Sequence, residues 1–256
     1  MNIVPSSTHP AAATSGASYE AFANHPGYRR MFAPDRLTIG IFLPLRFFQG
    51  DMTVLQGQSE LVAEIDMESR GERFAEAVSY FRHLTAPGRP QISSRLGALN
   101  GADFLPKPAA GRIPLIVTGS SRQDRTWLAE NADGWLTYPQ ATHTAEGPQR
   151  LANIIQDWRT KIPDGGFRPH MTNDWLDLVD DPDFPRTPLR GGFVLKTGRK
   201  GLIDLLSEWK KAGVNHAALG IQFSERPAKE IIQELAEEIL PLFPSLEGPE
   251  PLSAKW

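Results

Sequence analysis

The chain has 256 residues, 40% of them hydrophobic, and a formal net charge of −3 at pH 7. This length predicts one or two domains, and this charge argues against nucleic acid or an anionic membrane as a partner. The sequence has no cysteine, which excludes disulfides, zinc–thiolate sites, iron–sulfur clusters and cysteine nucleophiles. No apolar run reaches the roughly 18–20 residues of a membrane-spanning helix.

Composition divides the chain into a body and two tails. Residues 1–33 begin with a stretch rich in Ala, Ser, Thr and Pro and lack the apolar segment of a secretory signal. We therefore predict a disordered N-terminal tail and a cytoplasmic protein, with organelle targeting left open. Within this tail, Tyr28–Phe32 is the part that we expect to dock on the body. Residues 34–244 form the predicted α/β domain, and residues 245–256 form a C-terminal tail.

The body begins with a predicted strand, loop and helix. Leu37–Leu45 is apolar enough for a buried strand, Arg46–Asp51 is a loop, and Thr53–Ile65 has apolar residues at helical spacing. Phe47 and Phe48 follow the strand, so they are candidates to face a flat aromatic cofactor. Such a pair also commonly packs beneath a loop, and both interpretations stand.

A second helix follows where an α/β protein normally has a strand. Ser69 and Glu72 have the spacing of a capping box, and the residues after them form one apolar helical face: Phe74, Val78, Phe81 and Leu84. Thr85–Arg112 then contains four prolines and several glycines, which predicts a long surface loop. Loops of that length are uncommon in compact domains and often functional.

The stretch Ile113–Pro139 predicts a complete βαβ unit. Ile113–Thr118 is the first strand, Gly119-Ser120-Ser121 is a tight turn, Arg122–Asn131 is the helix, and Trp135–Tyr138 is the second strand. Backbone N–H groups, two hydroxyls and the positive end of a helix can together hold a phosphate. A plain turn with a serine helix cap is the alternative.

The rest of the chain continues the alternation of helices and strands. The predicted elements are the helix Pro148–Lys161, the strand Met171–Val179, the Pro-rich excursion Asp180–Arg190, the short apolar segment Gly191–Leu195, the helix Arg199–Ala212, the strand Ala217–Phe223 and the helix Pro227–Leu240. This order predicts a parallel α/β sheet, either a (β/α) barrel or a doubly wound sheet. In a barrel, functional residues lie on the loops after the strands.

Other chemical motifs are sparse. The six histidines are scattered without metal-ligand spacing, so no metal site is predicted, and His170 and His216 are expected to be structural. Tyr138 and Trp175 lie near strand ends, where they can stack on a cofactor or substrate or pack in the core. Lys196 is the one residue near a strand end that an isomerase or aldolase could use.

Several segments resemble the bacterial-luciferase-like flavin-dependent oxidoreductases. They are PDRLTIGIFLPL, GQSELV, ESRGERFAEAV, IPLIVTGSSRQDRTWLAENADGWLTYP and GRKGLIDLLSEWKKAGVNHAALGIQF, which occur in this order between Tyr28 and Pro244. The resemblance implies a (β/α)8 barrel and a monooxygenase or oxidoreductase that uses reduced FMN or a deazaflavin. It also implies a small organic substrate, O2 and an NAD(P)H:flavin reductase as partners, with a homo-oligomer left open.

The resemblance also implies where the cofactor binds. In that family, the loop that matches the Gly-Ser-Ser turn lies near the flavin phosphate. The candidate cofactor-binding residues are therefore Gly119, Ser120, Ser121, Gln123, Phe47 and Tyr138. Asp124 falls where some relatives have a threonine that contacts the phosphate, and we do not assign it that role because a carboxylate repels phosphate. No catalytic residue is identified.

The sequence departs from the family by an internal gap. Relatives have the second to fourth strands between the segments that match Thr53–Ile65 and Glu68–Leu84, which here are nearly adjacent. Leu37–Phe243 has 207 residues, and without the loop Thr85–Arg112 and the excursion Asp180–Arg190 it has 168. At about 31 residues per βα unit, taken from roughly 250 residues per eight-stranded barrel, this gives about five units. We therefore predict an incomplete barrel and an enzyme that is impaired. The alternative is a non-catalytic remnant that associates with itself or with a full-length relative.

Overall fold

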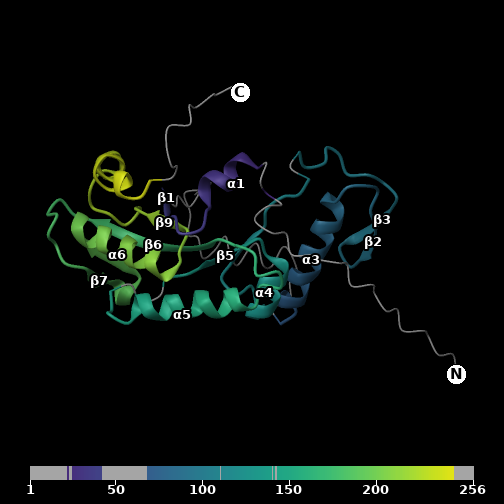
Figure 1. The fold of residues 1–256 in the computed structure, drawn as a ribbon, viewed down its shortest axis with the longest axis horizontal. Helices are drawn as coiled ribbons and strands as arrows, with labels where there is room; N and C mark the ends of the chain where they lie inside the picture. Colours follow the sequence, from purple (N-terminus) through teal and green to yellow (C-terminus); the bar gives the residue numbers. More distant parts are fainter. Residues whose placement is uncertain are drawn as a thin grey trace.

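The computed structural model describes residue 22 and residues 25–41, 68–109, 111–139, 141 and 143–244. Helices and strands alternate along most of this part of the chain (Figure 1). The strands are β1 (Thr38–Ile41), β2 (Gln91–Ser94), β3 (Gly97–Asn100), β4 (Ile116–Thr118), β5 (Gly134–Thr137), β6 (His170–Leu178), β7 (Thr187–Leu189), β8 (Val194–Thr197) and β9 (His216–Gly220). The helices are α1 (Pro26–Met31), α3 (Arg70–Thr85), α4 (Arg125–Asn131), α5 (Gly147–Thr160), α6 (Arg199–Ala212) and α7 (Ala228–Glu234).

The main sheet contains an open arc of parallel strands in the order β1-β9-β6-β5-β4. Along the chain, β5 pairs with β4, β6 with β5 and β9 with β6, and β1 pairs with the far side of β9. Among the described residues, β1 and β4 do not pair with each other, so the arc does not close into a barrel. The predicted incomplete barrel of about five parallel strands is confirmed for the described residues, in which five strands form the arc and β8 runs parallel to the end of β6.

A ribbon of two further strands extends the central strand. The last residues of β6 pair in parallel with β8, with Leu176 opposite Leu195, and β7 pairs antiparallel with β8. The sequence predicts Asp180–Arg190 as an excursion without a strand, but β7 lies at its end. Pro188 obscured this strand, because proline is normally confined to edge strands, and β7 is one here.

The largest core lies between the arc and the helices on its outer face. Residues of α6 at helical spacing, Leu202, Leu205, Leu206 and Trp209, pack with Leu176 and Leu178 of β6. This spacing explains the helix, and Gly213 ends it with a φ of 97°, a conformation that favours glycine. The predicted bounds Arg199–Ala212 are confirmed.

Helix α1 packs on the opposite face of the arc from α5 (Figure 1). Phe22, Tyr28 and Phe32 are buried there against Met171 of β6, and the Tyr28 hydroxyl donates to the Asp133 carbonyl at 2.9 Å. The predicted disordered tail of residues 1–33 is therefore wrong in its last part, whereas docking of Tyr28–Phe32 is confirmed. Burial of three aromatic side chains outweighs the polar composition around them.

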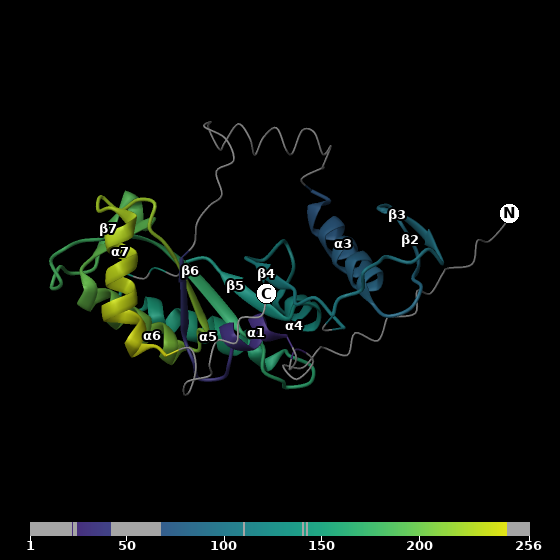
Figure 2. The ribbon, with the colours of Figure 1, turned by 90° about the horizontal axis from the view of Figure 1, so that it is seen from above.

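The segment between α3 and β4 is not the featureless loop that the sequence predicts. Within Thr85–Arg112, β2 and β3 form an antiparallel hairpin, with Gln91 opposite Asn100. Its turn is fixed to α3 because the Glu76 carboxylate accepts from the backbone and the guanidinium of Arg95, both at 2.9 Å. In Figure 2 this hairpin and α3 lie at the far end of the molecule from α6 and α7.

Several predicted bounds change. The final helix is α-helical only to Glu234, continues as a π-helical turn (Leu235–Ile239) and ends in a 3-10 turn (Leu240–Leu242). Strand β4 begins at Ile116 rather than Ile113. The predicted helix Thr53–Ile65, the end of the predicted strand after Ile41 and the predicted tail from residue 245 lie outside the described residues.

Candidate functional site

The Gly-Ser-Ser turn lies between a strand and a helix, as the sequence predicts. Thr118 ends β4, and α4 begins at Arg125. Gly119 has a φ of 61°, Ser121 a φ of 48° and Arg122 a φ of 57°. Left-handed backbone is uncommon for residues other than glycine and tends to occur at functional sites, so two such residues in sequence mark this turn as a site candidate.

Two aromatic residues contact Gly119: Trp135 in β5 and Tyr138 just after it. The indole Nε1 of Trp135 donates to the Gly119 carbonyl at 2.7 Å. On the other side, a Cβ built on Gly119 would lie 3.1 Å from Cε2 of the Tyr138 ring. Glycine is therefore required both by its φ and by this close approach.

The polar side chains of the turn make local hydrogen bonds. The Ser120 hydroxyl accepts from the Arg122 N–H at 3.2 Å, and the Ser121 hydroxyl donates to the Thr118 carbonyl at 3.3 Å. The Gln123 amide donates to the Gly71 carbonyl at 2.7 Å and to the Ser121 carbonyl at 3.2 Å. Gln123 thus ties the turn to the first turn of α3, and its role in cofactor binding stays a prediction.

The cap of α4 is an aspartate rather than the serine that the sequence suggests. The Asp124 carboxylate accepts from the Trp127 N–H at 2.7 Å. A carboxylate at this position stabilises the helix through the helix dipole, and it also opposes the binding of a phosphate at the same helix end. The sequence analysis gave Asp124 no phosphate-binding role, and its place as the cap is consistent with that.

Arg122 is a candidate that the sequence analysis missed. It is exposed, lies within the turn, and forms no ion pair with a described residue. Its Cβ lies 3.0 Å from the position that a Cβ on Gly71 would take, at the start of α3. A single arginine one residue after Gly-Ser-Ser was the available signal, because guanidinium groups bind phosphate well.

The remaining predicted site residues have different outcomes. Tyr138 is 56% exposed and lies beside the turn, where a cofactor ring could reach it. Trp175 lies on β6 and stacks on Phe193, with ring centroids 4.4 Å apart, so part of its surface is already covered by protein. Phe47 lies outside the described residues.

A buried aspartate aligns the strands that carry the turn. The Asp133 carboxylate accepts from Arg112 at 2.6 Å, from the Leu115 N–H at 2.8 Å and from Arg82. Arg82 belongs to α3, Leu115 precedes β4, and Asp133 precedes β5, so this one carboxylate joins three elements. The Leu115 carbonyl also accepts from the Asp133 N–H at 2.8 Å, so contact between the two chain segments continues just before β4 and β5.

The two buried histidines are structural. Burial lowers the pKa of His170 to about 3 and that of His216 to about 4. Both rings are therefore neutral near pH 7, and His216 Nδ1 lies 2.8 Å from the Thr38 hydroxyl. Within the described ranges no three His, Asp or Glu side chains group as metal ligands.

Lys196 has the wrong electrostatic surroundings for covalent catalysis. Its ammonium lies 3.0 Å from the buried Asp177 carboxylate, and this hydrogen bond raises the pKa of Lys196. A lysine nucleophile needs a lowered pKa, because only the neutral amine attacks a carbonyl. The contact therefore argues against the aldolase-type alternative.

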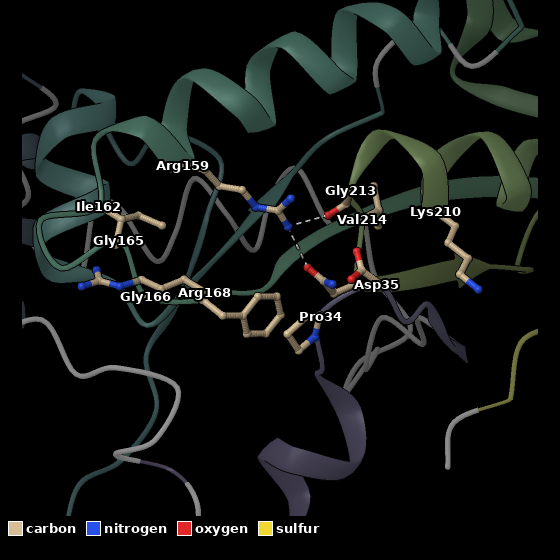
Figure 3. Close-up of a pocket in the computed structure, with 12 residues that line it drawn as sticks. Pro34, Asp35, Arg159, Ile162, Gly165, Gly166, Arg168, Lys210, Gly213 and Val214 are labelled. Carbon is tan, nitrogen blue, oxygen red and sulfur yellow. Dashed lines mark hydrogen bonds between the residues drawn. The ribbon is translucent and has the colours of Figure 1, made fainter. Parts of the chain in front are cut away.

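A cavity of about 280 Å³ lies at the opposite, amino-terminal end of the strands (Figure 3). Arg159 reaches across it and donates to the Gly213 carbonyl at 2.8 Å and to Asn215 at 3.2 Å. The Arg168 side chain extends away from Arg159 in Figure 3 and donates to two carbonyls at the end of α4. These cations stabilise helix C-termini, so we interpret the cavity as structural.

Comparison with known proteins supports the sequence-based assignment. Residues 50–166 match the family model described as luciferase-like monooxygenase. The predicted resemblance to the luciferase-like family is confirmed. A search of curated proteins found no match.

Solved structures support a luciferase-like fold. Monooxygenase RslO1 from Streptomyces bottropensis aligns with a TM-score of 0.56 and 13% identity, over 81% of this chain and 68% of its own. Coenzyme F420-dependent tetrahydromethanopterin reductase from Methanopyrus kandleri aligns with a TM-score of 0.50 and 13% identity, over 69% and 64%. An F420-dependent secondary alcohol dehydrogenase aligns with a TM-score of 0.48 and 18% identity, over 63% and 59%.

The chain thus aligns with 59–68% of the length of these structures. At these identities the likeness concerns the fold alone. It agrees with the open arc of parallel strands β1-β9-β6-β5-β4. Among the described helices, none is long and apolar enough to cross a membrane.

Proposed function

We propose that this luciferase-like chain is an oxidoreductase that binds a reduced flavin or deazaflavin at the carboxyl ends of β4, β5 and β6. The observation that carries this proposal is the Gly119–Gln123 turn. It combines left-handed backbone, a glycine held between Trp135 and Tyr138, and an exposed arginine. When bound, the cofactor would supply the redox chemistry, and the protein would orient it and limit the access of water.

The residues of the turn fit a phosphate only in part. Arg122 supplies a positive charge, and the two serine hydroxyls are held by bonds of 3.2–3.3 Å that a phosphate oxygen could replace. Asp124 caps the helix and opposes an anion there. The positive charge of Arg122 therefore offsets the negative charge of Asp124, and it does not add to the attraction of an uncapped helix end. This balance favours a weakly bound phosphate.

The experiment is a titration of the purified protein with FMN and, separately, with coenzyme F420, followed by quenching of cofactor fluorescence. We expect the Arg122→Ala variant to bind FMN about tenfold more weakly, the equivalent of one charge-assisted hydrogen bond. Riboflavin lacks the phosphate, so its affinity should not change. Arg125→Ala is the matched control, because Arg125 already pairs with Asp157.

Two results would count against this proposal. If the protein quenches the fluorescence of neither FMN nor F420, the chain is not a flavin-type oxidoreductase. If Arg122→Ala weakens FMN and riboflavin equally, the turn does not hold the phosphate. Substrate-dependent oxidation of the bound reduced cofactor would establish the activity and would identify which of the two cofactors is used.

The second candidate is a non-catalytic remnant that associates with itself or with a full-length relative. The observation that favours it is the open arc, because among the described strands one edge of β1 and one edge of β4 have no partner. Unpaired strand edges promote association with other chains. A concentration series in size-exclusion chromatography with light scattering tests it, and a monomer at all concentrations that melts cooperatively would contradict it.

A further inference from the structure

Asn173 is a buried polar residue without an evident structural task. It lies on β6 between Met171, which packs under α1, and Trp175, so its side chain belongs to the concave face of the arc. The residue is 4% exposed, and among the described residues its amide oxygen has no hydrogen-bond partner. Most buried polar atoms in folded proteins have such a partner, and an unpaired one calls for an explanation.

Asn215 shows what a structural asparagine looks like in the same chain. It is 2% exposed, its amide oxygen accepts from the His170 N–H at 3.0 Å and from Arg159 at 3.2 Å, and its amide nitrogen donates to the Ala33 carbonyl at 3.0 Å. Asn215 therefore stabilises the protein. The amide oxygen of Asn173 is desolvated without this compensation, which destabilises the protein.

Asn173 lies in line with the Gly-Ser-Ser turn. In the register of β5 and β6, Thr137 at the end of β5 is opposite Thr172, so Tyr138 and Asn173 are the next residues along the two chains. Tyr138 in turn covers Gly119. Two strand spacings of about 4.8 Å each separate β4 from β6, a distance that the extended chain between a phosphate and a flavin ring can span.

The next position along this row carries a small side chain. Asn173 is opposite Ala218 on β9, and Ala218 is opposite Gly40 on β1. The ring of His216 lies against Gly40, because a Cβ there would come within 2.9 Å of it. In the order of the strands, Asn173 thus lies between Tyr138, which is exposed, and Ala218, which is small, an arrangement that suits the edge of a flat ligand.

We propose that the Asn173 amide binds the pyrimidinedione edge that flavins and deazaflavins share. That edge alternates C=O acceptors with an imide N–H donor, and a primary amide offers one acceptor and two donors. This inference rests on the proposed function, and it assigns the ring of the cofactor to a position over Tyr138 with its polar edge at β6. The energetic cost of the unpaired amide is then recovered on binding.

The test uses Asn173→Leu, which is similar in volume and removes the amide, with Asn215→Leu as the control. Without ligand, the melting temperature of Asn173→Leu should stay the same or rise, because no hydrogen bond is lost. That of Asn215→Leu should fall by about 5 °C or more. Native protein and Asn173→Leu are then titrated with FMN and with F420. For whichever cofactor the native protein binds, the affinity of Asn173→Leu should be about tenfold lower.

A blocked ligand adds a second measurement. FMN methylated at N3 lacks the imide donor, so the native protein should bind it more weakly than FMN, whereas Asn173→Leu should bind the two alike. If Asn173→Leu fails to fold, Asn173→Asp, which also loses the amide donors, replaces it in the same titrations. If the protein binds F420 rather than FMN, the affinities of native protein and Asn173→Leu for F420 decide whether Asn173 contacts the ring.

The outcomes separate this inference from the proposed function. If native protein and Asn173→Leu bind a cofactor equally well, the role of Asn173 is overturned and the proposed function stays intact. Native protein that binds neither cofactor overturns both. A selective loss of binding in Asn173→Leu, together with unchanged or raised thermal stability, supports the inference.

Discussion

Replacing Asp133 with alanine should be the most damaging single change among the contacts around the site. Its carboxylate is 1% exposed and accepts from two arginines and one backbone N–H. Removing the acidic partner of a buried ion pair costs about 3–5 kcal/mol, because the cations stay behind without compensation. Arg82 and Arg112 keep side-chain exposures of 16% and 30%, so water can partly solvate them. We therefore expect a loss of about 3–4 kcal/mol, including the bond to Leu115.

The assay is urea unfolding at pH 7, followed by circular dichroism and tryptophan fluorescence. The loss corresponds to about 6–16 °C in melting temperature for a domain of this size. Asp157→Ala is the matched control, because Asp157 also contacts two cations but is 41% exposed, and its loss should cost less than about 1 kcal/mol. Equal losses for Asp133→Ala and Asp157→Ala would refute the reasoning that burial makes the Asp133 contacts decisive.

Two further predictions concern stability. Gly119→Ala should unfold in less urea than Gly165→Ala, because both glycines have a φ near 61–62° but only Gly119 faces Tyr138 at 3.1 Å; equal changes would contradict this contact. His170 and His216 have pKa values of about 3 and about 4 in the folded state, against 6.5 when unfolded, so stability is complete above pH 6.5 and decreases as the pH falls below it. Between pH 7 and pH 5, each of the two histidines should lower the free energy of unfolding by about 2 kcal/mol. In urea titrations, the His216→Gln variant should therefore lose about half of this acid sensitivity.

Where local patterns and long-range packing agree, the sequence was sufficient. Helix α6 has a continuous apolar stripe and a glycine stop at Gly213, and its predicted bounds are correct. The turn after β4 could be located because Gly119 interrupts a run of β-branched residues. The count of about five parallel strands followed from the chain length without the long loop and the excursion, and the described arc β1-β9-β6-β5-β4 agrees with it.

The sequence failed where a single contact decides the structure. The β2–β3 hairpin has short strands with weak alternation, and its turn is held by Arg95 bonding to Glu76 on another element. The choice of Asp124 over serine as the helix cap depends on the left-handed backbone at Ser121 and Arg122, which no composition rule predicts. Asn173 was missed because an unpaired buried amide can be recognised only when its neighbours are known.

The open arc sets a limit on the affinity of the site. A micromolar complex requires about 8 kcal/mol, net of the entropy lost on association. The described residues offer the turn, whose phosphate contacts are each worth about 1.5–3 kcal/mol at best and are opposed by Asp124, and one amide on β6. In a closed barrel, further strands would add contacts and exclude water from the reduced ring, which otherwise reacts with O2 without coupling to substrate. Because the described arc ends at β1 and β4, tight binding would require a wall from beyond these strands. A dissociation constant well below micromolar for the isolated chain would therefore mean that another part of the chain, or a second chain, closes the site.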